Sequence, residues 1–163
     1  MLIEGLQKTT LIDYPGKIAA TVFLVGCNFR CPFCYSSELV LPEKIEKQPQ
    51  VSEKEFFDFL KKRRGLLDSI VICGGEPTIQ SSLPEFIRRI KKMGFLVKLD
   101  TNGSNPALLS SLFKQKLLDY VAMDIKAPLQ KEQYEKAIGV KGELSKIKNS
   151  IAPKQAQIVY TYW

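Results

Sequence analysis

The sequence contains no histidine, and this absence removes several kinds of active site. Nucleophilic pairs of the Ser–His or Cys–His type need an imidazole as general base, and histidine is also a common metal ligand. Cysteine is scarce as well: there are four in 163 residues, and three of them fall between positions 27 and 34. In a cytosolic protein such a cluster indicates metal or redox chemistry rather than a disulfide framework.

Long apolar runs are also missing. The longest, Ile18–Val25, is far shorter than the roughly 20 residues that a membrane span requires. Glu4 and Lys8 interrupt the N-terminus before the apolar region of a secretory signal can form, so we expect a cytoplasmic protein with no membrane partner. The densest basic run, at positions 61–64, follows an apolar-periodic stretch and therefore fits a helix C-terminus better than a nucleic-acid surface. We expect no nucleic-acid partner.

Predicted strands and helices alternate along the chain. Apolar runs rich in β-branched and aromatic residues indicate strands, and apolar residues at helical spacing indicate the helices between them. The predicted strands are 18–25, 69–73, 95–99, 120–125 and 157–161. The predicted helices are one that opens at a capping box at 52–55, and then 83–90, 106–115, 131–137 and 143–150. We read the proline-containing segment before the first helix as a loop. The alternation predicts a single α/β domain with a parallel sheet and right-handed crossovers.

The unusual residues of the sequence all lie at the C-terminal ends of predicted strands or directly after them. They form four groups, at 26–34, 74–77, 100–103 and 124–126. The carboxyl ends of parallel strands meet at one edge of a sheet, and α/β folds place their active sites there. The sequence therefore predicts an enzyme whose site is built from these four groups.

The first group holds Cys27, Cys31 and Cys34 on one short loop. Soft thiolates suit iron–sulfur clusters and zinc alike. Ferredoxin-type clusters use four cysteines, so three would leave one iron open to a small ligand. The alternative is a structural zinc site completed by Cys73, although such sites commonly use paired knuckles of two cysteines each. Outside a zinc site, Cys73 is expected to be a small buried strand residue.

Five stretches of the sequence, in this order, resemble one known family. They are 8–17 (KTTLIDYPGK), 26–34 (GCNFRCPFC), 74–78 (GGEPT), 100–103 (DTNG) and 124–128 (DIKAP). The cysteine spacing, with the aromatic Phe33 before the last cysteine, resembles the signature of the radical S-adenosylmethionine superfamily. Within it, the five stretches resemble the anaerobic ribonucleoside-triphosphate reductase activating proteins. The resemblance implies a partial (β/α) barrel and a four-iron four-sulfur cluster on Cys27, Cys31 and Cys34.

The resemblance also implies how S-adenosylmethionine is bound. Gly74 and Gly75 would let the backbone approach the methionine moiety, and Glu76 would accept a charge-assisted hydrogen bond from its ammonium group. Phe33 would lie near the adenine. The other implied cofactor-binding residues are Asp100, Thr101, Asn102, Asp124 and Lys126. Of these, Asp100, Thr101 and Asp124 are implied to lie near the sulfonium and to hold a monovalent cation. Without the resemblance, Asp100 and Asn102 are typical of turns.

The activity that the resemblance implies is the reductive cleavage of S-adenosylmethionine and the formation of a glycyl radical on a partner enzyme. The implied partner is anaerobic ribonucleotide reductase, with flavodoxin or ferredoxin as electron donor. Two alternatives remain open. One is a radical enzyme acting on a small molecule, in the manner of 7-carboxy-7-deazaguanine synthase, and the other is a non-catalytic scaffold that binds zinc or a cluster.

The resemblance ends near Ile151. We therefore expect residues 1–17 to form an N-terminal strand or extension, 18–151 the βα core and 152–163 a divergent tail. The C-terminal part of the barrel is expected to be missing, which leaves about five parallel strands.

Overall fold

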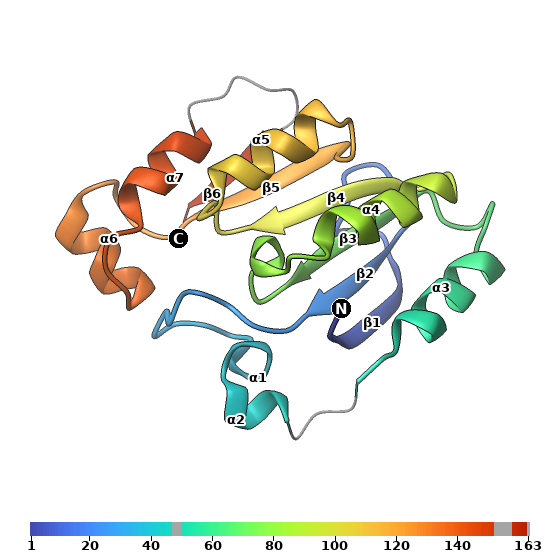
Figure 1. The fold of residues 1–163 in the computed structure, drawn as a ribbon, viewed down its shortest axis with the longest axis horizontal. Helices are drawn as coiled ribbons and strands as arrows, with labels where there is room; N and C mark the ends of the chain where they lie inside the picture. Colours follow the sequence, from blue (N-terminus) through green and yellow to red (C-terminus); the bar gives the residue numbers. More distant parts are fainter. Residues whose placement is uncertain (47–49, 152–157, 163) are drawn as a thin grey trace.

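A single six-stranded sheet forms the centre of the molecule. The computed structural model describes residues 1–46, 50–151 and 158–162. The strands are β1 (Ile3–Thr10), β2 (Ala19–Leu24), β3 (Ser69–Gly74), β4 (Leu96–Thr101), β5 (Tyr120–Ile125) and β6 (Ile158–Tyr162). They lie in sequential order, with β1 antiparallel to β2 and all later neighbours parallel (Figure 1). Five parallel strands with intervening helices confirm the predicted α/β class.

Helices connect the parallel strands. They are α1 (Ser37–Val40), α2 (Pro42–Ile45), α3 (Glu53–Lys62), α4 (Leu83–Lys92), α5 (Pro106–Lys114), α6 (Lys131–Ile138) and α7 (Leu144–Ile151), with a 3₁₀ turn, η1, at Pro77–Ile79. The prediction of a loop before α3 was wrong in part, because α1 and α2 lie there. Each has four residues, too few to display a helical repeat.

The start of α3 shows how local sequence sets an element. Ser52 accepts a hydrogen bond from the backbone N–H of Glu55, and the Glu55 carboxylate accepts one from the backbone N–H of Ser52. This reciprocal capping box satisfies two N–H groups that a helix N-terminus otherwise leaves unpaired. The predicted capping box is therefore confirmed.

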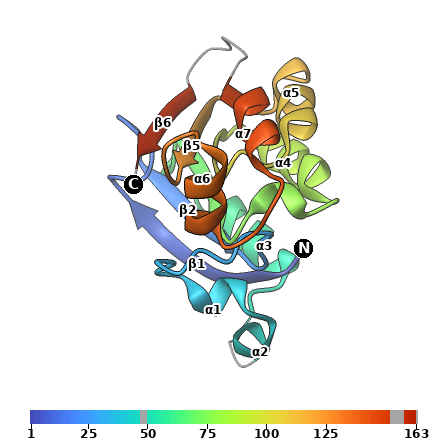
Figure 2. The same cartoon turned by 90° about the vertical axis from the view of Figure 1, so that its left-hand side faces the viewer.

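The main apolar core lies between the sheet and helices α3, α4 and α5. Phe56, Phe86 and Leu112 on these helices are buried against Val22 and Ile72 on the strands. Figure 2 shows α4, α5 and α7 together on one side of the strands. On the other face, a small cluster forms where Tyr14, in the β1–β2 connection, packs on Ala19 and Val71.

A second apolar cluster supports the cysteine loop from the C-terminal side. Phe29 in the loop is buried with Tyr134 and Ile138 of α6 and with Ile147 of α7. The backbone N–H of Arg30 also donates to the carbonyl of Ile138 at 2.8 Å. Figure 1 shows the segment after β2 running toward α6. These contacts fix the loop at the carboxyl end of β2.

The segment predicted as a divergent tail contributes a strand. β6 pairs with β5 in parallel, from Val121 opposite Ile158 to Ile125 opposite Tyr162. The predicted strand at 157–161 is thus confirmed from 158 onward, while 152–157 and 163 lie outside the described residues. Among the described residues, no helix has the length and apolar character needed to cross a membrane.

Candidate active site

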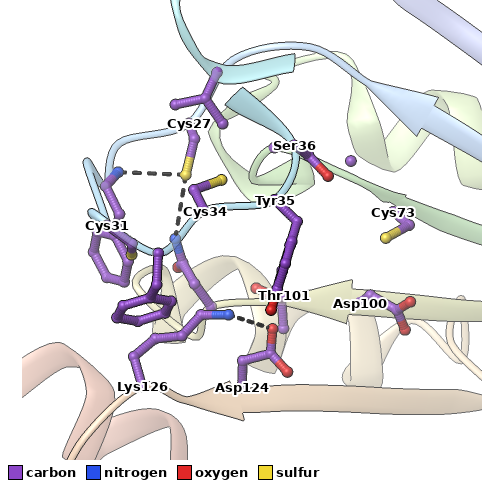
Figure 3. A pocket seen from close by; sticks show the side chains of 16 residues that line it. Cys27, Cys31, Cys34, Tyr35, Ser36, Cys73, Asp100, Thr101, Asp124 and Lys126 are labelled. Atoms are coloured by element: carbon purple, nitrogen blue, oxygen red, sulfur yellow. Dashed lines mark hydrogen bonds and ion pairs between the residues drawn. The ribbon is translucent and has the colours of Figure 1, made fainter. Parts of the chain in front are cut away.

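One pocket collects the predicted site residues at the carboxyl ends of β2 to β5. Every residue predicted from the sequence to bind metal or cofactor lines it, with the exception of Glu76. The residues that sequence reasoning did not assign to the site are Phe29, Tyr35, Ser36, Val40 and Cys73. Figure 3 shows the three loop cysteines on one side of this pocket and Cys73 with Asp100 on the other.

The three loop cysteines face the pocket to different degrees. Cys27 and Cys31 are partly buried, and Cys34 is exposed. The Cys27 sulfur accepts a hydrogen bond from the backbone N–H of Phe29 at 3.4 Å. Burial is the main cause that raises the pKa of Cys27 to about 11, and burial also raises the pKa of Cys31. Both thiols are therefore protonated at neutral pH, and metal binding would release their protons.

Cys73 does not join the three loop cysteines. It lies apart from them across the pocket (Figure 3). The zinc alternative needs Cys73 as its fourth ligand, and a structural zinc site holds its four ligands around one ion. The place of Cys73 therefore does not favour the four-cysteine zinc site.

Gly74 and Gly75 are required by the packing of the chain itself. A Cβ on Gly74, whose φ is +118°, would lie 2.2 Å from the carbonyl oxygen of Leu24, and a Cβ on Gly75 would lie 2.0 Å from that of Gly26. The backbone N–H of Gly75 donates to Leu24 at 2.9 Å, and that of Glu76 donates to Gly26 at 2.8 Å. The end of β3 is therefore in direct backbone contact with the segment that leads into the cysteine loop.

Glu76, predicted to accept a hydrogen bond from the cofactor's ammonium group, lies outside the lining of the pocket. Glu76 is 1% exposed. One carboxylate oxygen accepts hydrogen bonds from the backbone N–H and hydroxyl of Thr78 and from the Thr101 hydroxyl at 2.7 Å. The other accepts one from the backbone N–H of Asn102 at 2.6 Å. The carboxylate turns inward because the ends of β3 and β4 present these donors beneath the pocket.

Asp100 and Asp124, which line the pocket, each pair with a lysine on the same strand or just after it. Lys98 donates to Asp100 at 2.5 Å, and Lys126 donates to Asp124 at 2.6 Å. Burial raises the pKa of Asp100, and the charge of Lys98 opposes that shift. Sequence reasoning missed Lys98, which is 8% exposed. Strand alternation predicts its position: Lys98 lies two residues before Asp100, and residues two apart on a strand share a face.

Cys73 lies in the pocket as well as in the strand. It is the fifth residue of β3 and lies beside Asp100 (Figure 3). Burial, followed by the negative charge of Asp100, raises the pKa of its thiol to about 12. The expectation of a small buried strand residue is correct for its place in β3, but Cys73 is only partly buried and lines the pocket.

The sequence profile of the Radical SAM superfamily matches residues 21–152, and the chain belongs to this superfamily. The match spans β2 to α7 and so contains every strand end that lines the pocket. The family implies a four-iron four-sulfur cluster and S-adenosylmethionine as cofactors. Three soft thiols beside an open pocket are a donor set that fits the cluster.

Relatives within the superfamily have several activities. A Methanocaldococcus jannaschii protein, provisionally named a glycyl-radical enzyme activating enzyme, is 40% identical over 154 residues, which are 92% of this chain and 60% of that protein. The 7-carboxy-7-deazaguanine synthase of Hyperthermus butylicus is 32% identical over 95 residues, 58% of this chain and 38% of that protein. The aligned part of the chain thus covers less than two thirds of the length of each of these relatives.

A solved structure shows the same fold at low identity. QueE from Escherichia coli matches with a TM-score of 0.62 and 15% identity, over 99% of this chain and 84% of that one. The likeness shows the same fold over nearly the whole chain.

Proposed function

We propose that this chain is the catalytic core of a radical S-adenosylmethionine activating enzyme that forms a glycyl radical on anaerobic ribonucleoside-triphosphate reductase. The observation that carries the proposal is the convergence of the three loop cysteines with the ends of β3, β4 and β5 on one pocket. The 40% identity to a provisionally named activating enzyme supports the choice of substrate class.

In this proposal the residues of the pocket divide into two sets. Cys27, Cys31 and Cys34 hold the cluster and leave one iron open to the amino acid end of S-adenosylmethionine. The backbone at Gly74 and Gly75 and the ring of Phe33 bound the space for the rest of the cofactor. The two ion pairs described above, Lys98 with Asp100 and Lys126 with Asp124, lie where the sulfonium and any monovalent cation would be held.

The chemistry itself comes from the bound groups. When bound, the cluster would supply one electron for the reductive cleavage of the sulfur–C5′ bond of S-adenosylmethionine, and a hydrogen atom from the α-carbon of a partner glycine would complete the products methionine, 5′-deoxyadenosine and a glycyl radical. The protein residues orient the cofactor and exclude water. Flavodoxin or ferredoxin is the proposed source of the electron.

A small-molecule substrate is the second candidate, because a 7-carboxy-7-deazaguanine synthase is among the relatives. The two candidates differ in what accelerates the release of 5′-deoxyadenosine. An activating enzyme responds to the reductase and transfers the radical to it, whereas a small-molecule enzyme responds to a deazapurine precursor. A non-catalytic scaffold produces no 5′-deoxyadenosine with either.

The test is anaerobic reconstitution with iron and sulfide, followed by incubation with S-adenosylmethionine, a reductant and anaerobic ribonucleotide reductase. We expect 5′-deoxyadenosine together with the electron paramagnetic resonance doublet of a glycyl radical on the reductase. A reductase whose target glycine is replaced by alanine is the control and should give no such signal. Stimulation by the 7-deazaguanine precursor, with no radical on the reductase, would overturn the proposal in favour of the second candidate.

A further inference from the structure

Three polar side chains join the cysteine loop to the loop after β4. The Asn102 side-chain N–H group donates to the Asn28 carbonyl oxygen at 3.0 Å, and the Asn28 N–H group donates to the Ser104 hydroxyl at 2.9 Å. The same Asn102 nitrogen lies 3.9 Å from the sulfur of Cys27. We call the contacts among Asn28, Asn102 and Ser104 the amide clasp.

The direction of these hydrogen bonds is fixed by one backbone group. The backbone N–H of Ser104 can only donate, and it lies 2.9 Å from one terminal atom of Asn102. That atom must be the oxygen, so the nitrogen of Asn102 faces Asn28 and Cys27. Asn28 consequently presents its oxygen to Asn102 and its nitrogen to Ser104. The assignment of a donor beside the Cys27 sulfur thus follows from the network.

The base of the clasp is held rigidly beneath the pocket. Asn102 and Ser104 are both 6% exposed. The backbone N–H of Asn102 donates to the buried Glu76 carboxylate at 2.6 Å, and the Ser150 hydroxyl on α7 donates to the carbonyl of Gly103 at 2.6 Å. Two other elements, the β3 end and α7, therefore fix the loop that presents the Asn102 side chain to the cysteine loop.

We propose that Asn102 is a positioning residue for Cys27, and through it for the cluster, rather than a ligand of S-adenosylmethionine. The clasp holds the first cysteine of the loop against β4. The Asn102 N–H group also points at the Cys27 sulfur, and donors to cysteine sulfurs stabilise the more negative, reduced state of an iron–sulfur cluster. This inference rests on the proposed cluster, but its clasp can be tested without metal.

The first arm of the test uses the metal-free protein. Amide hydrogen exchange of residues 27–34 is compared between the wild-type protein and the Asn28→Ala, Asn102→Ala and Ser104→Ala variants. Each variant removes at least one clasp hydrogen bond, so exchange in this loop should become about tenfold faster. Asn105→Ala is the matched control: Asn105 caps α5 in the same loop and donates to the carbonyl of Thr78, and among the described residues it makes no side-chain hydrogen bond to the cysteine loop. Unchanged exchange in the first three variants would overturn the clasp.

The second arm measures the reduction potential of the reconstituted cluster by electron paramagnetic resonance. Asn102→Ala should shift the potential to more negative values, because it removes the donor at Cys27. Ser104→Ala should leave it near the wild-type value, since Asn102 remains. If Asn102→Ala does not fold, Asn28→Ala is measured in its place. A wild-type potential in Asn28→Ala, together with faster amide exchange in residues 27–34, supports the same two roles: the clasp holds the loop, and the Asn102 N–H group acts on the Cys27 sulfur.

The result that would overturn the proposal is a wild-type potential in Asn102→Ala with a loss of affinity for S-adenosylmethionine, which would make Asn102 a cofactor ligand. A wild-type protein that binds no iron would instead overturn the proposed function, while the exchange arm would still decide whether the clasp exists.

Discussion

Individual polar residues at the strand ends make hydrogen bonds within the protein that hold neighbouring segments together. Glu76 and Asn102 are both predicted to bind S-adenosylmethionine, and in the structure their side chains also accept or donate hydrogen bonds within the protein. Sequence motifs show which residues gather at a strand end, but they do not show which unpaired backbone N–H groups those residues must satisfy. Buried N–H groups are almost always paired, so they compete with any ligand for nearby carboxylates.

Glu76→Gln tests whether the Glu76 carboxylate stabilises the fold by pairing with backbone N–H groups. Each oxygen of Glu76 accepts a hydrogen bond from a backbone N–H, one from Thr78 and the other from Asn102. A glutamine must place its NH₂ group opposite one of these donors. The free energy of unfolding of the metal-free protein should therefore fall by about 1.5–3 kcal/mol, measured by urea denaturation. Unchanged stability with weakened binding of S-adenosylmethionine would instead restore the direct contact that the sequence suggested.

Cys73 offers a prediction about pH. Its pKa is raised to about 12, mainly by burial, so the reactive thiolate is about one part in ten thousand at pH 8. The alkylation rate of Cys73 in the metal-free protein should rise about tenfold per pH unit from pH 7 to 10 and stay far below that of the exposed Cys34. Mass spectrometry of iodoacetamide-treated protein gives both rates. Equal rates at pH 8 would contradict a buried, protonated Cys73.

At the scale of elements, most of the fold follows from periodicity and capping. The strand predicted at 120–125 is β5 without any change, and the capping box places the start of α3. The other strand predictions differ from the structure by one or two residues at their ends. The helices α1 and α2 were not predicted, because each completes only about one turn. The amide clasp could not be predicted, because it joins residues 28 and 102 through geometry that no local pattern records.

The contact between the end of β3 and the segment before the cysteine loop predicts that β3 positions this loop. Gly75→Ala would place a Cβ 2.0 Å from the carbonyl oxygen of Gly26, so the cysteine loop must move. We expect a loss of about 1–3 kcal/mol in unfolding free energy and a lower iron content after reconstitution. Gly5→Ala on β1 is the control, since its Cβ would meet only the Phe23 ring at 3.4 Å. Equal iron content in the two variants would show that this junction does not position the loop.

At the scale of the molecule, sequential parallel strands bring four distant segments to one pocket. Residues near positions 27, 74, 101 and 125 come together because each follows a strand of the same sheet. The sequence could predict this gathering from the parallel topology, and the pocket confirms it. Two features could not be predicted from the sequence, because they depend on the direction that each side chain takes. They are the ion pairs that lysines make with Asp100 and Asp124, and the inward orientation of the Glu76 carboxylate.

Iron content after anaerobic reconstitution tests most directly whether this pocket holds a cluster. The wild-type protein should bind about four irons per chain. Cys27→Ala, Cys31→Ala and Cys34→Ala should each lose the cluster, and Cys73→Ala should retain it because Cys73 lies across the pocket (Figure 3). A colourless protein that holds one zinc, and that loses this zinc in Cys73→Ala, would contradict the assignment.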